Sequence, residues 1–85
     1  MKKVEIYIKK YCPYCRRALD LLDSKGVPFT KFEVSENEEL FAQIKQQTGS
    51  TTVPQIFIDG EFIGGCDDIH ELNHAGELDR KLGLS

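Results

Sequence analysis

Two cysteines three positions apart, Cys12 and Cys15, stand between a strand-like segment and a helix-like segment. Residues 3–8 alternate apolar and polar side chains as a β-strand does, and residues 13–25 carry apolar side chains at helical spacing. Cys12 is therefore expected at a helix N-terminus, where unpaired backbone N–H groups and the helix dipole favour a negative charge. Pro13 suits the first helical turn, because its missing N–H would have no partner there. The pattern predicts a nucleophilic thiolate at Cys12 with a second thiol in reach.

Composition and charge exclude several classes of protein. We expect 85 residues to form one domain, over 1–85, around a single core. A net charge of −3 with mixed signs gives no reason to expect a nucleic acid or a membrane as partner. No segment resembles a signal peptide or a membrane span, so we expect a cytoplasmic protein. Three cysteines in such a chain do not form a disulfide framework, and the pair is then redox-active or metal-binding.

Local signals predict the remaining elements. Ser35, with Glu38 three residues later, is expected to cap a second helix that ends at Gly49, and Asp59-Gly60 is a hairpin turn signal. The other expected elements are a strand over residues 29–34, strands over 55–58 and 61–63, and a last helix after residue 65 that breaks near residue 76. The order β-α-β-α-β-β-α predicts an α/β protein with a four-stranded mixed sheet, helices on both faces and a central first strand.

The segment Thr52-Val53-Pro54 directly precedes the third strand and has two interpretations. Proline is tolerated at the start of a strand, so the segment can be a rigid turn. Alternatively, the Val53-Pro54 bond is cis and leaves the backbone of Val53 free, beside the thiols, to bind an extended peptide. The sequence alone does not decide between them.

The segment Gly64-Gly65-Cys66-Asp67-Asp68 opens the last helix. Glycines let a ligand approach the backbone, and a helix N-terminus offers N–H groups to a carboxylate. With a nearby acidic side chain, this site would recognise a free amino-acid head group, although both aspartates are also ordinary helix-start residues. Cys66 is expected to be a small, semi-buried residue; a thiol open to glutathionylation is the alternative.

A structural zinc site is the alternative to a redox dithiol. Cys66 and His70 could complete a Cys3His set with Cys12 and Cys15. Pro13 and the position between strand and helix favour the redox interpretation, and we expect His70 and His74 to be exposed rather than metal-binding.

In this order, Cys-Pro-Tyr-Cys, Thr-Val-Pro and Gly-Gly-Cys-Asp-Asp resemble the dithiol glutaredoxins, especially the small bacterial glutaredoxins of the glutaredoxin 3 type. The resemblance covers essentially the whole chain. It implies a thioredoxin fold and a glutathione-dependent thiol–disulfide oxidoreductase, with glutathione as co-substrate and no metal. It also implies a monomer whose partners are glutathionylated or disulfide-containing proteins, and it leaves open whether ribonucleotide reductase is one of them.

The resemblance assigns Cys12 as the nucleophile and Cys15 as the resolving thiol. Residues 52–54 would pair with the cysteinyl part of glutathione, and residues 66–67 would bind its γ-glutamyl group. Lys9 would bind the glycine carboxylate, and Tyr14 would form an aromatic wall beside the mixed disulfide. The seven residues implied in glutathione binding are thus Lys9, Tyr14, Thr52, Val53, Pro54, Cys66 and Asp67.

Two departures and one alternative remain. Tyr11 stands where many relatives carry a smaller residue, so access to Cys12 is expected to differ. Gln43 and Gln47 are both candidates for the glycine carboxylate, and neither is assigned. An iron–sulfur carrier, a dimer that bridges a cluster with Cys12 and bound glutathione, is the alternative from another class, against which Pro13 and Cys15 argue.

Overall fold

The strands form a single sheet with β1 at its centre. The computed structural model describes residues 2–84. Its strands lie in the order β2-β1-β3-β4; β2 is parallel to β1, β3 is antiparallel to β1, and β4 is antiparallel to β3. The elements are β1 Val4–Ile8, α1 Pro13–Ser24, β2 Thr30–Glu33, α2 Glu38–Thr48, β3 Gln55–Ile58, β4 Glu61–Gly64, α3 Cys66–His74 and α4 Leu78–Leu82. The predicted mixed sheet and its central first strand are confirmed.

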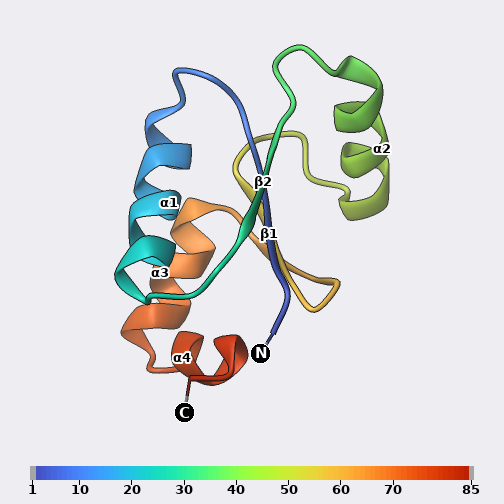
Figure 1. The fold of residues 1–85 in the computed structure, drawn as a ribbon. Helices are drawn as coiled ribbons and strands as arrows, with labels where there is room; N and C mark the ends of the chain where they lie inside the picture. Colours follow the sequence, from blue (N-terminus) through green and yellow to red (C-terminus); the bar gives the residue numbers. More distant parts are fainter. Residues whose placement is uncertain (1, 85) are drawn as a thin grey trace.

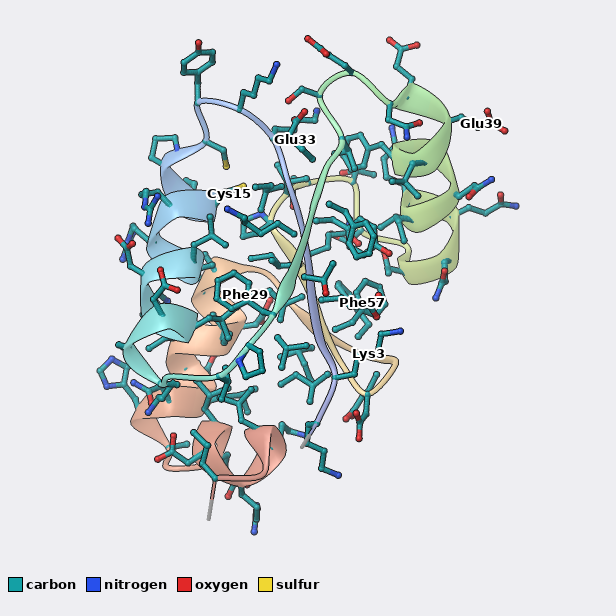
Figure 2. All side chains as sticks on the ribbon, in the orientation of Figure 1. Lys3, Cys15, Phe29, Glu33, Glu39 and Phe57 are labelled. Carbon is teal, nitrogen blue, oxygen red and sulfur yellow. The ribbon has the colours of Figure 1, made fainter. Side chains whose placement is uncertain are left out.

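Helices cover both faces of the sheet. Figure 1 shows α1, α3 and α4 on one face and α2 on the other. The alternation in β1 sends Val4 and Ile6 into the core under α1 and α3, where both are buried. An aromatic layer lies on the other face, where Tyr7 stacks on Phe32 with ring centroids 4.7 Å apart and meets the edge of Phe57 at 5.6 Å. In Figure 2, Phe57 lies on the α2 side of the sheet.

The predicted hairpin turn forms between β3 and β4. Asp59 and Gly60 both have positive φ, 51° and 81°, as a turn that matches the twist of the strands requires. The carboxylate of Asp59 also accepts a hydrogen bond from the backbone N–H of Lys3 at 2.7 Å. The turn therefore holds the start of β1 as well as the hairpin.

The predicted cap of the second helix was wrong. Asn37 is the N-cap of α2, and its side-chain oxygen accepts from the backbone N–H of Leu40 at 3.1 Å. The Ser35 hydroxyl instead accepts from the backbone N–H of Lys10 at 2.9 Å, so its capping oxygen serves the loop before Cys12. Capping depends on where the chain leaves β2, and this strand ends at Glu33 rather than at residue 34.

The end of the chain differs from the prediction by one added element. α3 ends at His74, and the predicted break at Gly76 is confirmed by its positive φ of 75°. The five residues Leu78–Leu82 then form α4, whose two leucines at the ends are buried in the core. Among residues 2–84, no helix combines the length and the apolar character needed to cross a membrane.

Candidate active site

Cys12 is the last residue of the loop between β1 and α1, and its sulfur caps the helix. Cys12 is the N-cap of α1, with extended backbone angles, and Pro13 follows at the first helical position. Its Sγ accepts a hydrogen bond from the backbone N–H of Cys15 at 3.2 Å. The sulfur thereby takes one of the backbone N–H groups that a helix N-terminus otherwise leaves without a partner. Cys12 is half-buried and therefore still within reach of a substrate.

Cys15 is in a very different environment from Cys12. Its side chain is 2% exposed, and Figure 2 shows it pointing from α1 toward the strands. Burial raises the pKa of the Cys15 thiol to about 12, and the hydrogen bond with Cys12 and the charge of Cys12 add to the effect. The pair thus consists of an accessible sulfur that accepts a hydrogen bond and an inner thiol that stays protonated at neutral pH.

A groove of about 430 Å³ lies between the start of α1, the loop before β3 and the start of α3. Six of the seven residues implied in glutathione binding line it, and only Lys9 does not. We call it the α3-side groove; its lining residues are Tyr14, Ser50, Thr52, Val53, Pro54, Phe62, Gly64, Gly65, Cys66, Asp67 and Asp68.

The loop before β3 presents free backbone to this groove. The Val53-Pro54 peptide bond is cis, which is the second of the two interpretations of this segment. Within residues 2–84, no hydrogen bond engages the backbone N–H or C=O of Val53. Buried or half-buried backbone groups of this kind need a partner. An extended ligand in the groove can supply one through strand-like hydrogen bonds.

Gln55 anchors this loop, a role that the sequence analysis missed. Its side chain is completely buried, and its Nε2 donates to the carbonyl oxygens of Ser50 at 2.9 Å and Thr52 at 3.0 Å. Its Oε1 accepts from the hydroxyl of Thr48 at 2.9 Å. Because two carbonyl oxygens can only accept, the amide orientation is fixed by its partners. The signal was present in the sequence: a lone polar side chain in a strand whose other residues, 56–58, are all apolar.

The two aspartates at the start of α3 have different roles: one stabilises the helix start and the other faces the groove. The Asp68 carboxylate accepts from the backbone N–H of Gly65 at 2.9 Å, so it is a helix-start residue. A Cβ on Gly64, which has a φ of 129°, would lie 2.3 Å from that carboxylate, so this position requires glycine. Asp67 is exposed and lines the α3-side groove, which leaves its carboxylate available to a ligand.

Cys66 and His70 lie against each other one helical turn apart. Nδ1 of His70 is 2.9 Å from the carbonyl oxygen of Cys66 and 3.5 Å from its Sγ. The prediction that His70 is exposed was wrong; it is half-buried, whereas His74 is exposed. Burial, then the charges of Asp67 and Cys12, raise the pKa of the Cys66 thiol, against the opposing charge of Arg17. No group of three or more metal-binding side chains assembles within residues 2–84, so the Cys3His alternative is not supported.

Lys9 does not line the α3-side groove; its ammonium group packs on an aromatic ring of α2. Its Nζ is 4.4 Å from the centre of the Phe41 ring on α2, and Nζ of Lys45 is 4.6 Å from the same centre. Two ammonium groups therefore share one aromatic ring. The guanidinium of Arg17 lies 5.9 Å from the centre of the Tyr14 ring.

The unequal thiols predict selective alkylation. With a pKa of about 12, Cys15 should react with iodoacetamide at pH 7 about three orders of magnitude more slowly than an ordinary thiol with a pKa of about 8.5. We expect one adduct, on Cys12, between pH 7 and 9, measured by mass spectrometry of the reduced protein. In denaturing urea, the control should show three adducts. A folded protein alkylated on Cys15 at pH 7 would contradict this picture.

Comparisons with known proteins agree with this geometry. Residues 4–63 match the family model described as Glutaredoxin. Glutaredoxin 3 of Escherichia coli strain K12 is 51% identical over 82 residues, which cover 96% of this chain and 99% of that protein. A solved buckwheat glutaredoxin–glutathione complex has a TM-score of 0.91 at 34% identity and covers 96% of this chain and 77% of its own. A dithiolic glutaredoxin of Trypanosoma brucei brucei has a TM-score of 0.87 at 43% identity and covers 95% and 87%.

Proposed function

The chain belongs to the glutaredoxin family, and on that premise we propose that Cys12 is its nucleophilic thiol and Cys15 its resolving thiol. It is a glutathione-dependent thiol–disulfide oxidoreductase with a thioredoxin fold, and glutathione is its co-substrate. The observation that carries the assignment of the two thiols is the hydrogen bond from the Cys15 N–H to Cys12 Sγ, combined with the burial of Cys15.

The proposed reaction exchanges one disulfide for another. The Cys12 thiolate attacks the glutathione sulfur of a mixed disulfide, so that the substrate S–S bond breaks and a Cys12–glutathione disulfide forms. The substrate leaves as a thiolate and takes a proton from water. The thiolate of a second glutathione then attacks the glutathione sulfur of this disulfide, which releases oxidised glutathione and restores the Cys12 thiolate.

For a protein disulfide, Cys12 attacks one sulfur of the substrate and Cys15 completes the reaction. Cys15 attacks Cys12 Sγ, forms the Cys12–Cys15 disulfide and releases the second substrate thiol. The raised pKa of Cys15, about 12, keeps it protonated until its proton can pass to the leaving thiolate. Two glutathione molecules then reduce the Cys12–Cys15 disulfide and leave as oxidised glutathione.

We assign glutathione to the α3-side groove. Its cysteinyl backbone would pair with the free backbone of Val53, with Thr52 and Pro54 shaping the loop and Tyr14 as the wall. Its γ-glutamyl carboxylate would accept hydrogen bonds from backbone N–H groups at the start of α3, at Cys66. Its ammonium group would pair with the carboxylate of Asp67. Lys9 would meet the glycine carboxylate, and because Lys45 lies on the same Phe41 ring, we add Lys45 as a second cation there.

The cellular setting is proposed on the same grounds. Three cysteines that must stay reduced between turnovers favour a reducing compartment, the cytoplasm. Glutathionylated and disulfide-containing proteins are the proposed substrates, and ribonucleotide reductase is one candidate among them. We propose that the protein acts as a monomer.

Replacement of Cys15 by serine tests the division of labour. Turnover of the mixed disulfide between glutathione and 2-mercaptoethanol should stay within about threefold of wild type, because only Cys12 is needed for that route. Reduction of a protein disulfide should fall at least about a hundredfold, since the resolving step is lost. Both rates are followed as NADPH oxidation through glutathione reductase. Equal loss of both activities in a folded variant would refute the assignment.

A further inference from the structure

A second groove, of about 410 Å³, has Cys12 and Cys15 in its lining, whereas the α3-side groove has neither. We call it the α1-side groove. Ile8, Pro13 and Leu19 give it an apolar lining, and Lys9 and Arg16 contribute cations. Tyr11, Cys12 and Cys15 complete it. Of these eight residues, only Lys9, Cys12 and Cys15 also belong to the proposed glutathione site and reaction.

Tyr11, the residue before the proposed nucleophile Cys12, is fully exposed and has an unusual backbone conformation. Its side chain is 100% exposed, and its φ is +56°, a left-handed conformation that is rare for a bulky residue. Strain of this kind persists where the surrounding structure enforces it, and it concentrates at functional sites. The exposed large apolar side chains of residues 2–84 are Tyr11, Tyr14 and Leu84, so two of the three flank Cys12. Exposed aromatic residues are typical anchors of protein interfaces.

Positive charge gathers at the same place. Residues 9–17 contain four of the eleven cations of the chain and none of its fourteen acidic residues, although the net charge is −3. Lys10 and Arg16 pair with Glu36 and Asp20, but both pairs are exposed and therefore weak. An acidic partner could replace either carboxylate.

We propose that the α1-side groove and Tyr11 dock the polypeptide part of the substrate, an extended segment with apolar and acidic side chains next to its cysteine. This proposal rests on the proposed function, because it needs glutathione in the α3-side groove. The two sulfurs of a mixed disulfide are only about 2.05 Å apart, so the polypeptide must pass close to Cys12. Glutathione in the α3-side groove leaves the α1-side groove open, because the two grooves share no lining residue and Cys12 lines the α1-side groove. A small mixed disulfide has no chain to place there.

Three substrates and four variants test the proposal. The substrates are the mixed disulfide of glutathione and 2-mercaptoethanol, a ten-residue peptide with a central glutathionylated cysteine between leucine and aspartate residues, and the same peptide with lysine for aspartate. The variants are Tyr11→Ser and Arg16→Gln, with Leu84→Ser and Arg80→Gln as matched controls. Arg80, like Arg16, is an exposed helical arginine paired with a nearby acid: Asp20 in α1 for Arg16, and Glu77, the N-cap of α4, for Arg80.

Wild type should favour the acidic peptide over the basic one by about tenfold in kcat/KM at low salt, and added salt should narrow the difference. Tyr11→Ser should lower kcat/KM for the acidic peptide about tenfold, the loss typical of an interface anchor. Arg16→Gln should reduce the preference about threefold and weaken its salt dependence. The small substrate should change less than about twofold in both variants, and the controls should match wild type throughout.

Two results would overturn the proposal. Peptide kinetics unchanged in Tyr11→Ser and Arg16→Gln would show that the groove does not contact the polypeptide. Equal losses on the small substrate and the peptides would show that these residues act on Cys12 itself. In either case, turnover of the small substrate by wild type keeps the proposed function intact. No turnover of the small substrate by folded wild type would instead be a failure of the proposed function.

Discussion

Replacement of Cys12 by serine is expected to abolish turnover of both glutathione mixed disulfides and protein disulfides, by at least about a thousandfold. Cys12 is the accessible thiol, and its sulfur accepts a hydrogen bond from the Cys15 N–H. Cys15 and Cys66 are buried and have raised pKa values. A serine hydroxyl does not ionise at neutral pH and cannot form the disulfide with glutathione on which both routes depend. The rate is measured as NADPH oxidation coupled through glutathione reductase.

The fold of this variant should survive, which makes the loss interpretable. Serine is among the best N-cap residues, so its Oγ can accept the hydrogen bond that Cys12 Sγ accepts at the start of α1. We expect a free energy of unfolding within about 1 kcal/mol of wild type, measured by urea titration. Turnover above a few per cent in the folded variant would move the nucleophile to another thiol and reject the proposed mechanism.

Features that depend on neighbouring residues could be predicted from the sequence. The strand–thiol–helix arrangement at Cys12, the Asp59-Gly60 hairpin and the end of α2 at Gly49 follow from local backbone preferences, and the structure has all three. For residues 52–54 and 66–67, local physics predicted backbone groups able to bind an extended peptide and an amino-acid head group, and the resemblance named glutathione as the ligand. The structure brings these five residues to one groove.

Features that depend on distant partners could not be predicted. The Ser35 hydroxyl bonds to Lys10, 25 residues away, and this contact left Asn37 to cap α2. His70 seemed exposed because its partner, the Cys66 carbonyl, is a backbone group that any helix could present. The role of Gln55 could not be predicted because its partners lie in the irregular loop before it, and no sequence pattern specifies the path of that loop.

That loop makes Gln55→Leu the second variant with a large expected effect. Leucine fills a similar volume but leaves the carbonyl oxygens of Ser50 and Thr52 without their buried donor. Unsatisfied buried groups cost about 1–3 kcal/mol each when no water replaces the partner, so we expect a loss of roughly 2–4 kcal/mol in the free energy of unfolding. For a domain of this size, the midpoint of thermal unfolding should fall by roughly 10–20 °C, measured by circular dichroism.

The kinetics of the same variant distinguish a positioning residue from a purely structural one. Because the loop carries the free backbone of Val53, its displacement should raise KM for glutathione several-fold and leave kcat at saturating glutathione nearly unchanged. Thr48→Val is the matched control: it removes the hydroxyl that donates to Gln55 Oε1 and accepts from the Ser50 N–H, but keeps both hydrogen bonds from the Gln55 amide to the loop. It should cost about 1 kcal/mol of stability and leave KM unchanged. If both variants lose stability and neither changes KM, the buried amide holds the fold together without positioning the loop for glutathione.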